Sequence, residues 1–344
     1  MNKLTRCVNC GSSLIFSPEQ NMIVCEYCNS TYPIPLPSRE IKILRQYTSD
    51  YVPQPDANVQ NLFVCRSCNT THAVAEGKVS VRCPSCGDTN ISRADEKAVF
   101  PDGIIPFSLD KDKAITIFEK WLKKRKFAPS DLFKLCRNGK LSKVYVPIFN
   151  INATSVSAYN AMVKKVHTDN DTDTIYSTVH TVQDVSTREL RDKPLCANNV
   201  LDCALIEKIV SVNQETIVPY STEYLLGYYG TQTNTNIHDL LDNVTNVLKK
   251  ESEQKIRSKL KDKYDEIVHL NCNTQLKNIT FNYVYAPVFI NHFKYKNKNY
   301  HCYISGTSGK VAGTAPKSVG KILALVGGIF LAIGIAALVL LKII

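Results

Sequence analysis

The sequence lacks the short motifs that mark several enzyme classes. It contains no G-x4-G-K-S/T phosphate-binding loop, no G-x-S-x-G, no H-E-x-x-H and no G-x-G-x-x-G. Its seven histidines are scattered, without the spacing of metal ligands. These absences favour a non-enzymatic binding or scaffold role. Because a catalytic triad assembles in space and leaves no local motif, an uncharacterised hydrolase in the body stays an alternative.

The chain also lacks an apolar N-terminal run and a strong excess of one charge. No apolar run precedes Cys7, so we expect no secretory signal peptide. The net charge is +11, and two four-thiolate zinc sites would lower it to about +7. Such a mildly basic protein is compatible with contact to nucleic acid or anionic lipid, without establishing either.

Cysteine, in contrast, is abundant, with thirteen residues. Eight of them form two copies of one arrangement, in which fourteen residues separate two Cys-x2-Cys pairs. Zinc takes four thiolates tetrahedrally at this spacing and leaves no open position for water, so such sites are structural. We therefore predict two structural Zn²⁺ ions, and the predicted ligands are Cys7, Cys10, Cys25, Cys28, Cys65, Cys68, Cys83 and Cys86.

The residue after each cysteine pair supports this interpretation. It is Gly11, Asn29, Asn69 or Gly87, and these residue types best tolerate the positive φ of a metal knuckle. Iron in a rubredoxin-like site is the nearest alternative, and a redox pair is disfavoured because no βαβ context surrounds the cysteines. Four cysteines saturate the metal, so we interpret His72 as a surface strand residue rather than a ligand.

Five further cysteines match no metal motif. We interpret them as ordinary small apolar residues. They are Cys136, Cys196, Cys203, Cys272 and Cys302.

Patterning predicts an α+β fold class with five segments. Two small β zinc ribbons are expected at residues 1–34 and 58–95, separated by a proline-rich linker at residues 35–57. Residues 101–318 should form an α+β body with antiparallel strands and a long helix. Residues 321–342 should form one C-terminal transmembrane helix.

Within the body, helical spacing of apolar residues predicts two main helices. The first is capped by Ser108 or Asp110 and ends before Pro129, and the second, long helix covers residues 237–268. Alternation predicts strands over residues 143–167 and 172–182, joined by a turn at residues 169–173.

A short internal repeat runs through the strands of the body. Residues 144–149 and 284–289 share the pattern V-Y-x-P-I/V-F, which indicates two related β units. Because proline cannot donate to a strand ladder, each unit should break at a sheet edge or bulge.

Basic residues are concentrated between positions 119 and 143, a segment with nine Lys or Arg residues and two acidic ones. A solvated helix face with dipole compensation explains them, and a patch for anionic partners is the alternative. With Arg66, Lys78, Arg82 and Arg93, this run is the basis of a second hypothesis, membrane-tethered nucleic-acid binding.

Residues 322–341 are uncharged and apolar or small, long enough to span about 30 Å. They predict a tail anchor in contact with membrane lipid, and flanking lysines place the N-terminal domains in the cytosol. Small residues recur at every fourth position of this helix; they are Ala324, Gly328, Ala332 and Ala336. A plain lipid-facing surface explains them, and self-association through this helix is the alternative.

Several stretches together resemble a known family. They are "IPFSLDKDKAITIFEKWLKKRKFAPSDL" from residue 105, "VYVPIFNINATSVSAY" from residue 144, "IVPYSTEYLLGYY" from residue 217 and "YAPVFINHFKYKNKNYHCYISGTSGKVAGTAPKS" from residue 285. The chain thereby resembles transcription-factor-IIB-type zinc-ribbon proteins, also described as primosomal-protein-N-prime-like. The resemblance implies N-terminal zinc ribbons, often membrane spans, and an undetermined function.

These inferences lead to one functional hypothesis. The chain is expected to be a non-enzymatic, single-pass, tail-anchored membrane protein whose two structural ribbons act as cytosolic recognition or assembly modules for an unknown protein partner.

Overall fold

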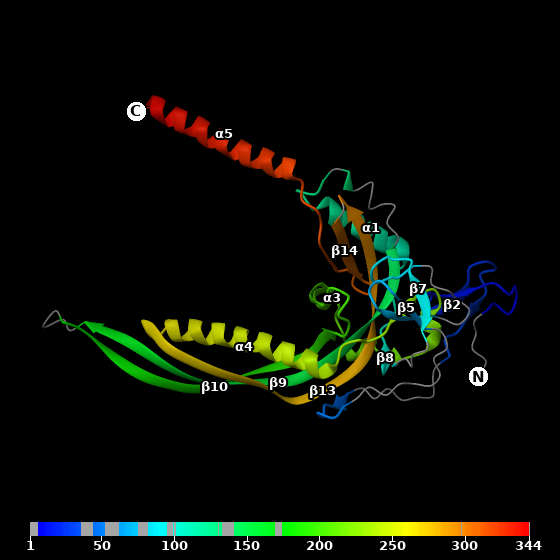
Figure 1. The fold of residues 1–344 in the computed structure, drawn as a ribbon, viewed down its shortest axis with the longest axis horizontal. Coiled ribbons are helices and arrows are strands. Elements are labelled where there is room, and N and C mark those ends of the chain that lie inside the picture. Colours follow the sequence, from blue (N-terminus) through cyan, green and yellow to red (C-terminus); the bar gives the residue numbers. More distant parts are fainter. Residues whose placement is uncertain are drawn as a thin grey trace.

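The protein consists of a head, which carries both cysteine modules, and a long arm (Figure 1). The computed structural model describes residues 6–35, 44–51, 62–74, 82–94, 99, 101–129, 131–132, 141–168, 174–296 and 298–343. The strands of the cysteine modules and linker are β1 (Leu14–Ser17), β2 (Met22–Cys25), β3 (Thr31–Tyr32), β4 (Arg45–Gln46), β5 (Leu62–Cys65), β6 (Thr71–Val74) and β7 (Ile91–Ala94). The body strands are β8 (Gly103–Ile104), β9 (Leu141–Thr168), β10 (Ile175–Cys196), β11 (Val218–Pro219), β12 (Tyr229–Thr231), β13 (Glu266–Tyr295), β14 (Lys298–Ser305) and β15 (Val311–Gly313). The helices are α1 (Lys111–Lys123), α3 (Cys203–Ile209), α4 (Ile237–Lys261) and α5 (Val319–Ile343), with 3-10 turns η1 (Gln214–Thr216) and η2 (Thr222–Leu225).

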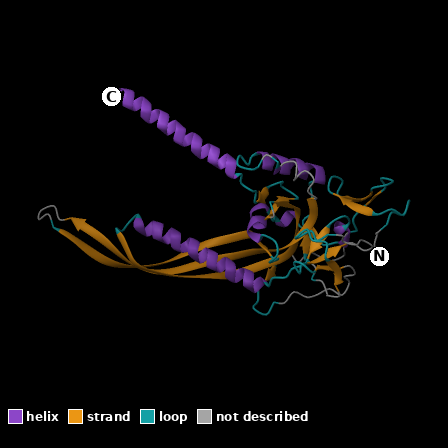
Figure 2. Ribbon diagram, turned by 45° about the horizontal axis from the view of Figure 1, so that its top comes forward, coloured by secondary structure: helices purple, strands orange, loops and turns teal. Residues whose placement is uncertain are grey.

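Two long strands, β9 and β13, run side by side through head and arm. They pair antiparallel from Leu141 opposite Asn291 to Lys164 opposite Glu266. β10 pairs with the other side of β9, as the predicted hairpin requires, although the turn at residues 169–173 lies outside the described residues. The far parts of these strands, with α4 lying along them, form the arm (Figure 2).

The large sheet is mixed, which corrects the body of antiparallel strands expected from the sequence. Its main path has the order β11-β8-β13-β9-β12-β6-β5-β7, so the strands of the second cysteine module continue the body sheet. Two of its pairings, β8 with β13 and β12 with β9, are parallel. Both short strands, β8 and β12, belong to connecting segments that run in the same direction as the long strand beside them. The alternation of apolar residues in the sequence does not reveal this direction.

The repeated V-Y-x-P-I/V-F segments form the centre of the sheet. They pair with each other antiparallel, with Val144 opposite Val288 and Ile148 opposite Val284. The two environments are also alike. β9 has parallel β12 beside Val144 and antiparallel β10 from Ile148, while β13 has parallel β8 beside Val284 and antiparallel β14 from Val288. The repeat therefore appears in space as a pseudo-two-fold arrangement.

This arrangement also explains the prolines. Pro147 and Pro287 lie in central strands, without a register shift, so the expected edge or bulge is wrong. On its outer side, β9 pairs with β12 before Pro147 and with β10 after it. In the same way, β13 pairs with β8 before Pro287 and with β14 after it. Their carbonyls are still used, since Pro147 accepts from Ala197 N at 2.9 Å and Pro287 from Gly306 N at 2.8 Å.

Aromatic side chains fill the head where the two repeats meet. Phe107 packs edge-to-face on Tyr145 and Phe289, with ring centroids 5.0 and 4.9 Å apart, and contacts Tyr228 at 4.8 Å. Gly306 closes this core, because a Cβ there would come within 2.5 Å of the Phe107 ring. The core thus depends on close backbone approach at one glycine.

The two predicted helices are present with corrected bounds. α1 is capped by Asp110, which accepts from Lys113 N at 2.7 Å, and buries Ala114, Phe118 and Leu122. α4 ends at Lys261, not near residue 268, because residues from 266 onward pair with β9 as β13.

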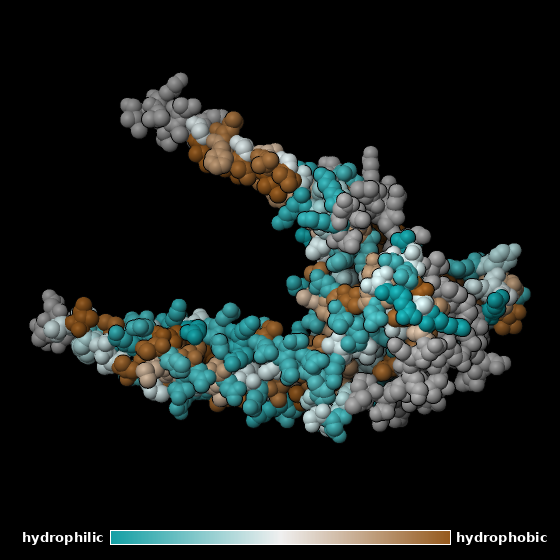
Figure 3. Space-filling model, viewed as in Figure 1, coloured by the Kyte–Doolittle hydropathy of each residue, from teal (hydrophilic) through white to brown (hydrophobic). Residues whose placement is uncertain are grey.

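The predicted transmembrane helix is not supported. Among the described residues, no helix is both long enough and apolar enough to cross a bilayer. Most of the described side chains of α5, among them Leu323, Phe330 and Ile333, are apolar and exposed (Figure 3). The tail anchor and the single-pass membrane location are therefore wrong for the chain as described. Lipid contact and self-association through this helix stay predictions.

We predict that Leu248→Ala lowers the free energy of unfolding by about 2–4 kcal/mol, because it removes a buried contact between α4 and the arm strands. Leu248 is 5% exposed and packs with Ala153 and Leu190. The neighbouring Val247 is 55% exposed, so Val247→Ala should cost about 0.5 kcal/mol or less. Urea unfolding measures both, and equal losses would contradict the packing of α4.

Candidate metal centres

The first four-cysteine cluster lies in the ribbon of β1, β2 and β3. Its sulfurs all lie within 4.8 Å of one another. Cys7 Sγ lies 3.4 Å from Cys28 Sγ, and Cys10 Sγ lies 3.5 Å from Cys25 Sγ. The Tyr32 hydroxyl, 3.3 Å from Cys7 Sγ, lowers the pKa of that thiol to about 5, although burial opposes the shift. The cluster therefore favours a thiolate at Cys7, which is the form that binds metal.

The second cluster lies in the module of β5, β6 and β7. Cys65 Sγ lies 3.7 Å from Cys86 Sγ, and Cys68 Sγ lies 3.7 Å from Cys83 Sγ. All four sulfurs again lie within 4.8 Å. The structure thus brings the eight predicted ligands together in two groups of four. Each group consists of the two Cys-x2-Cys pairs that are neighbours in the sequence.

The turn expected after each cysteine pair is present four times. Gly11, Asn29, Asn69 and Gly87 have φ values of 72°, 59°, 56° and 80°. Each donates its N–H to the carbonyl of the first cysteine of its pair, at 2.8 to 2.9 Å. This left-handed turn folds the backbone around the sulfurs. It confirms the prediction that Gly and Asn stand at these positions because they tolerate a positive φ.

The donor set fits a tetrahedral, thiophilic metal ion. A set of four sulfur donors within 4.8 Å of one another describes a closed site of the structural zinc type, and iron accepts the same set. When bound, such an ion holds two hairpins together and neutralises clustered thiolates. Each cluster can therefore hold one metal ion, and zinc is the plausible one.

His72 lies beside the second cluster and is only 2% exposed. Its Nε2 is 3.5 Å from Cys83 Sγ and 3.4 Å from Ser85 Oγ, and its Nδ1 is 3.2 Å from Thr231 Oγ1. Burial lowers the pKa of His72 to about 3, so its ring is neutral. The expectation of a surface residue was wrong, because β6 lies inside the sheet beside β12 and the His72 ring packs against Cys83, Ser85 and Thr231.

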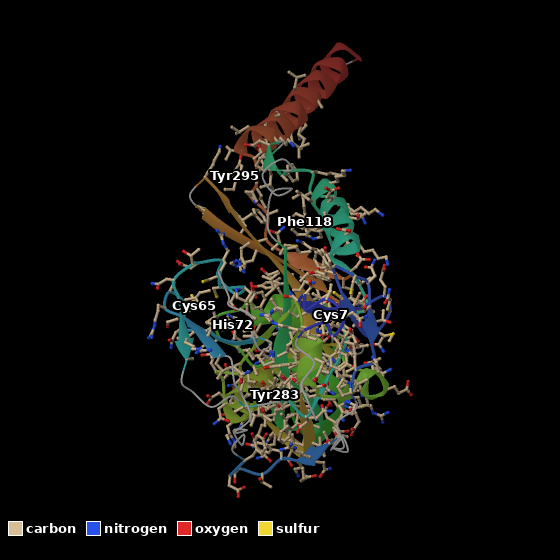
Figure 4. All side chains as sticks on the ribbon, turned by 90° about the vertical axis from the view of Figure 1, so that its right-hand side faces the viewer. Cys7, Cys65, His72, Phe118, Tyr283 and Tyr295 are labelled. Atoms are coloured by element: carbon tan, nitrogen blue, oxygen red, sulfur yellow. The ribbon has the colours of Figure 1, made fainter. Side chains whose placement is uncertain are left out.

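A single body segment, residues 224–232, contacts both modules; we call it the bridging segment. At its start, Leu226 O accepts from Phe16 N of the first ribbon at 2.9 Å, and the Phe16 ring packs edge-on against Tyr224. At its other end, β12 pairs with β6, and Gln232 N donates to Thr71 O at 2.9 Å. The two modules lie on different sides of the head (Figure 4), joined through this segment.

The two modules differ in how much of their knuckle surface is covered. In the second, Pro84 O accepts from His292 Nε2 of β13 at 3.1 Å, and Ser85 is buried. In the first, the knuckle residues Val8 and Tyr27 are 77% and 81% exposed. The second module is thus built into the sheet, while the first presents two large apolar side chains to its surroundings.

The remaining predicted site residues are not gathered into one site. Arg66, Arg82 and Arg93 are exposed on the second module, and Arg66 Nε donates to Ser92 Oγ at 2.8 Å. Lys78 and Cys136 lie outside the described residues. Of the other cysteines, Cys272 and Cys302 are buried apolar residues as expected, whereas Cys196 and Cys203 lie next to each other.

The arm carries one shallow hollow that bears on the hydrolase hypothesis. It encloses about 460 Å³ on the sheet surface, and amide side chains from three strands, including Asn160, Gln183 and Asn271, line it. Asp184 is the single carboxylate there, so the hollow offers no acid–base pair.

Fold and clusters together define an α+β protein with two small N-terminal four-cysteine β modules and a mixed-sheet body. The chain is a distant full-length homologue of the uncharacterized protein YdjG of Bacillus subtilis (strain 168): the two are 25% identical over 342 residues, which cover 97% of each chain. No family model matches this sequence, and no solved structure is similar to it.

We predict that losing the second metal site destabilises the body more than losing the first, because β6 pairs with body strand β12. Cys83→Ser should lower the free energy of body unfolding by about 2 kcal/mol or more. The matched Cys25→Ser should cost about 1 kcal/mol or less, since the first ribbon can unfold locally. Fluorescence of Trp121, the one tryptophan in the sequence, reports body unfolding. A larger loss in Cys25→Ser would contradict this.

Proposed function

We propose that this protein is a non-enzymatic assembly protein that two structural zinc ions hold in its folded form. The first ribbon recognises a partner protein, and the second module fixes the bridging segment to the body. The observation that carries this proposal is the difference between the modules: one is embedded in the body sheet, and the other exposes its knuckles.

The surface of the first ribbon supports a recognition role. Val8 and Tyr27 each occupy an inner position of a Cys-x2-Cys pair, so the metal fixes the backbone beneath both side chains. Exposed aromatic residues on a rigid base bind partners at low entropic cost, and tyrosine is enriched among residues that dominate interface energies. The partner is therefore expected to offer an apolar recess.

Contacts with α1 and with the bridging segment define where the first ribbon lies on the head. Lys113 Nζ of α1 pairs with Glu19 Oε1 at 2.8 Å, and Tyr228 donates to Phe16 O at 3.3 Å. A partner bound at the knuckles would thus be held at a defined position relative to the arm.

We predict that a photo-crosslinking amino acid at Tyr27 captures a defined partner in cells that make this protein naturally. Ser67 is the matched control, because it is exposed and holds the same place in a knuckle of the second module. Adducts from position 27 but not position 67, lost when Val8 is changed to Ser, would support the proposal. Absence of adducts at position 27, or the same adducts at both positions, would refute it.

A second candidate is nucleic-acid binding, favoured by the exposed end of α1. Lys120, Lys123, Lys124, Arg125 and Lys126 are all exposed there. Arg125 also lies over the Trp121 ring, 4.5 Å from its centroid, which keeps an aromatic and a cation together. Such surfaces bind phosphate backbones mainly through charge.

If this second function holds, affinity for a single-stranded oligonucleotide should fall steeply with salt. Changing Lys124 and Lys126 to Gln should reduce the slope of log affinity against log salt by about 1.4, because two phosphate contacts are lost. Fluorescence anisotropy at several salt concentrations measures this, with Lys298→Gln and Lys310→Gln as a charge-matched control. Absence of binding at low salt would exclude the function.

A further inference from the structure

Cys196 and Cys203 form a close cysteine pair outside both metal clusters. Cys196 ends β10 and is 1% exposed, while Cys203 begins α3 and is half-buried. Cys203 Sγ lies 3.4 Å from the carbonyl oxygen of Cys196 and 2.8 Å from the carbonyl oxygen of Asn198. The loop between them thus returns the Cys203 sulfur to the backbone of Cys196.

The surroundings make the two thiols unequal. The neighbouring Cys196 thiol lowers the pKa of Cys203, in spite of opposing burial. Burial raises the pKa of Cys196 well above its usual value. The more exposed thiol is thus also the more easily ionised, and thiolate character with access controls the oxidation of cysteine.

We propose that Cys196 and Cys203 are a site of reversible disulfide formation, with hydrogen peroxide as the oxidant. The Cys203 thiolate attacks one peroxide oxygen, the O–O bond breaks, and the hydroxide released takes up a proton to form water. The Cys196 sulfur then attacks the resulting Cys203 sulfenic acid, the S–O bond breaks, and a second water leaves with the Cys196 proton. The two thiols lose two electrons and two protons, and the peroxide is reduced to two waters. A thiol reductant reverses the change.

The loop closed by this disulfide lies directly against the end of the bridging segment. Asn198, which is fully buried, donates from Nδ2 to Gln232 O at 3.4 Å and accepts from Leu201 N at 3.1 Å. Thr233 Oγ1 donates to Ala197 O at 3.0 Å. The cross-link would therefore fix a loop that supports the strand onto which the second module pairs. This inference is independent of the proposed recognition function.

The test uses the full-length, zinc-loaded protein, graded hydrogen peroxide and peptide mapping after alkylation. We expect a Cys196–Cys203 cross-linked peptide, with a loss of about 2 Da per chain, before zinc appears in solution. Thermal unfolding of the oxidised protein should shift upward by roughly 5 °C, because a short loop is closed in the unfolded chain. A reductant should reverse both changes.

Variants separate a specific pair from general oxidation. Cys272→Ser changes a cysteine that is buried in the apolar core of the arm, and it should leave the cross-link unchanged. Cys196→Ser should leave Cys203 as a sulfenic acid that a dimedone-type reagent labels, which keeps the test valid if Cys203→Ser fails to fold. Cross-linking of Cys203 to any other cysteine, its conversion to sulfinic acid in the unaltered chain, or zinc release before the pair is modified would overturn the proposal.

Discussion

The folded head depends on bringing four sulfurs within 4.8 Å of one another at two places. Thiolates at this distance repel each other unless a cation lies between them, so metal binding and folding are coupled. The core of the first ribbon shows how little else is available. Its buried residues are Leu14, Ile23, two ligand cysteines and Leu226 from the body. Without the metal and without the body, this ribbon has no core of its own.

A metal ion would have different consequences at the two sites. In the second module it would lie next to the pairing of β6 with β12 and next to buried His72, so its removal would affect the body sheet. In the first ribbon it would fix the backbone beneath exposed Val8 and Tyr27, and this ribbon contacts the body through Phe16. Two similar motifs thus have different surroundings, one inside the sheet and one at the surface, and the bridging segment contacts both.

Local signals in the sequence predicted local structure well. The knuckle residue Asn29 has the expected positive φ, Asp110 caps α1 as expected, and β9 and β10 form the expected hairpin. In each case the interaction spans few residues, or follows a period that the sequence displays. The eight cysteines belong to the same group, because metal-ligand spacing is itself local.

Contacts between distant segments could not be predicted in this way. No local sequence pattern shows that Val144 lies opposite Val288, or that β6, which carries His72, pairs with β12. Pro147 was misplaced for the same reason, since a proline fits inside a sheet where outer neighbours change. For α5, the length of the uncharged run at residues 322–341 predicts a membrane span, yet among the described residues no helix is long and apolar enough to cross a bilayer.

X-ray absorption at the zinc edge, combined with metal analysis of the intact protein, tests the metal assignment most directly. We expect two zinc ions per chain, each with four sulfur neighbours at about 2.3 Å and no nitrogen neighbour. A single ion, a stoichiometric iron content, or a nitrogen ligand from His72 in place of a sulfur would contradict the assignment.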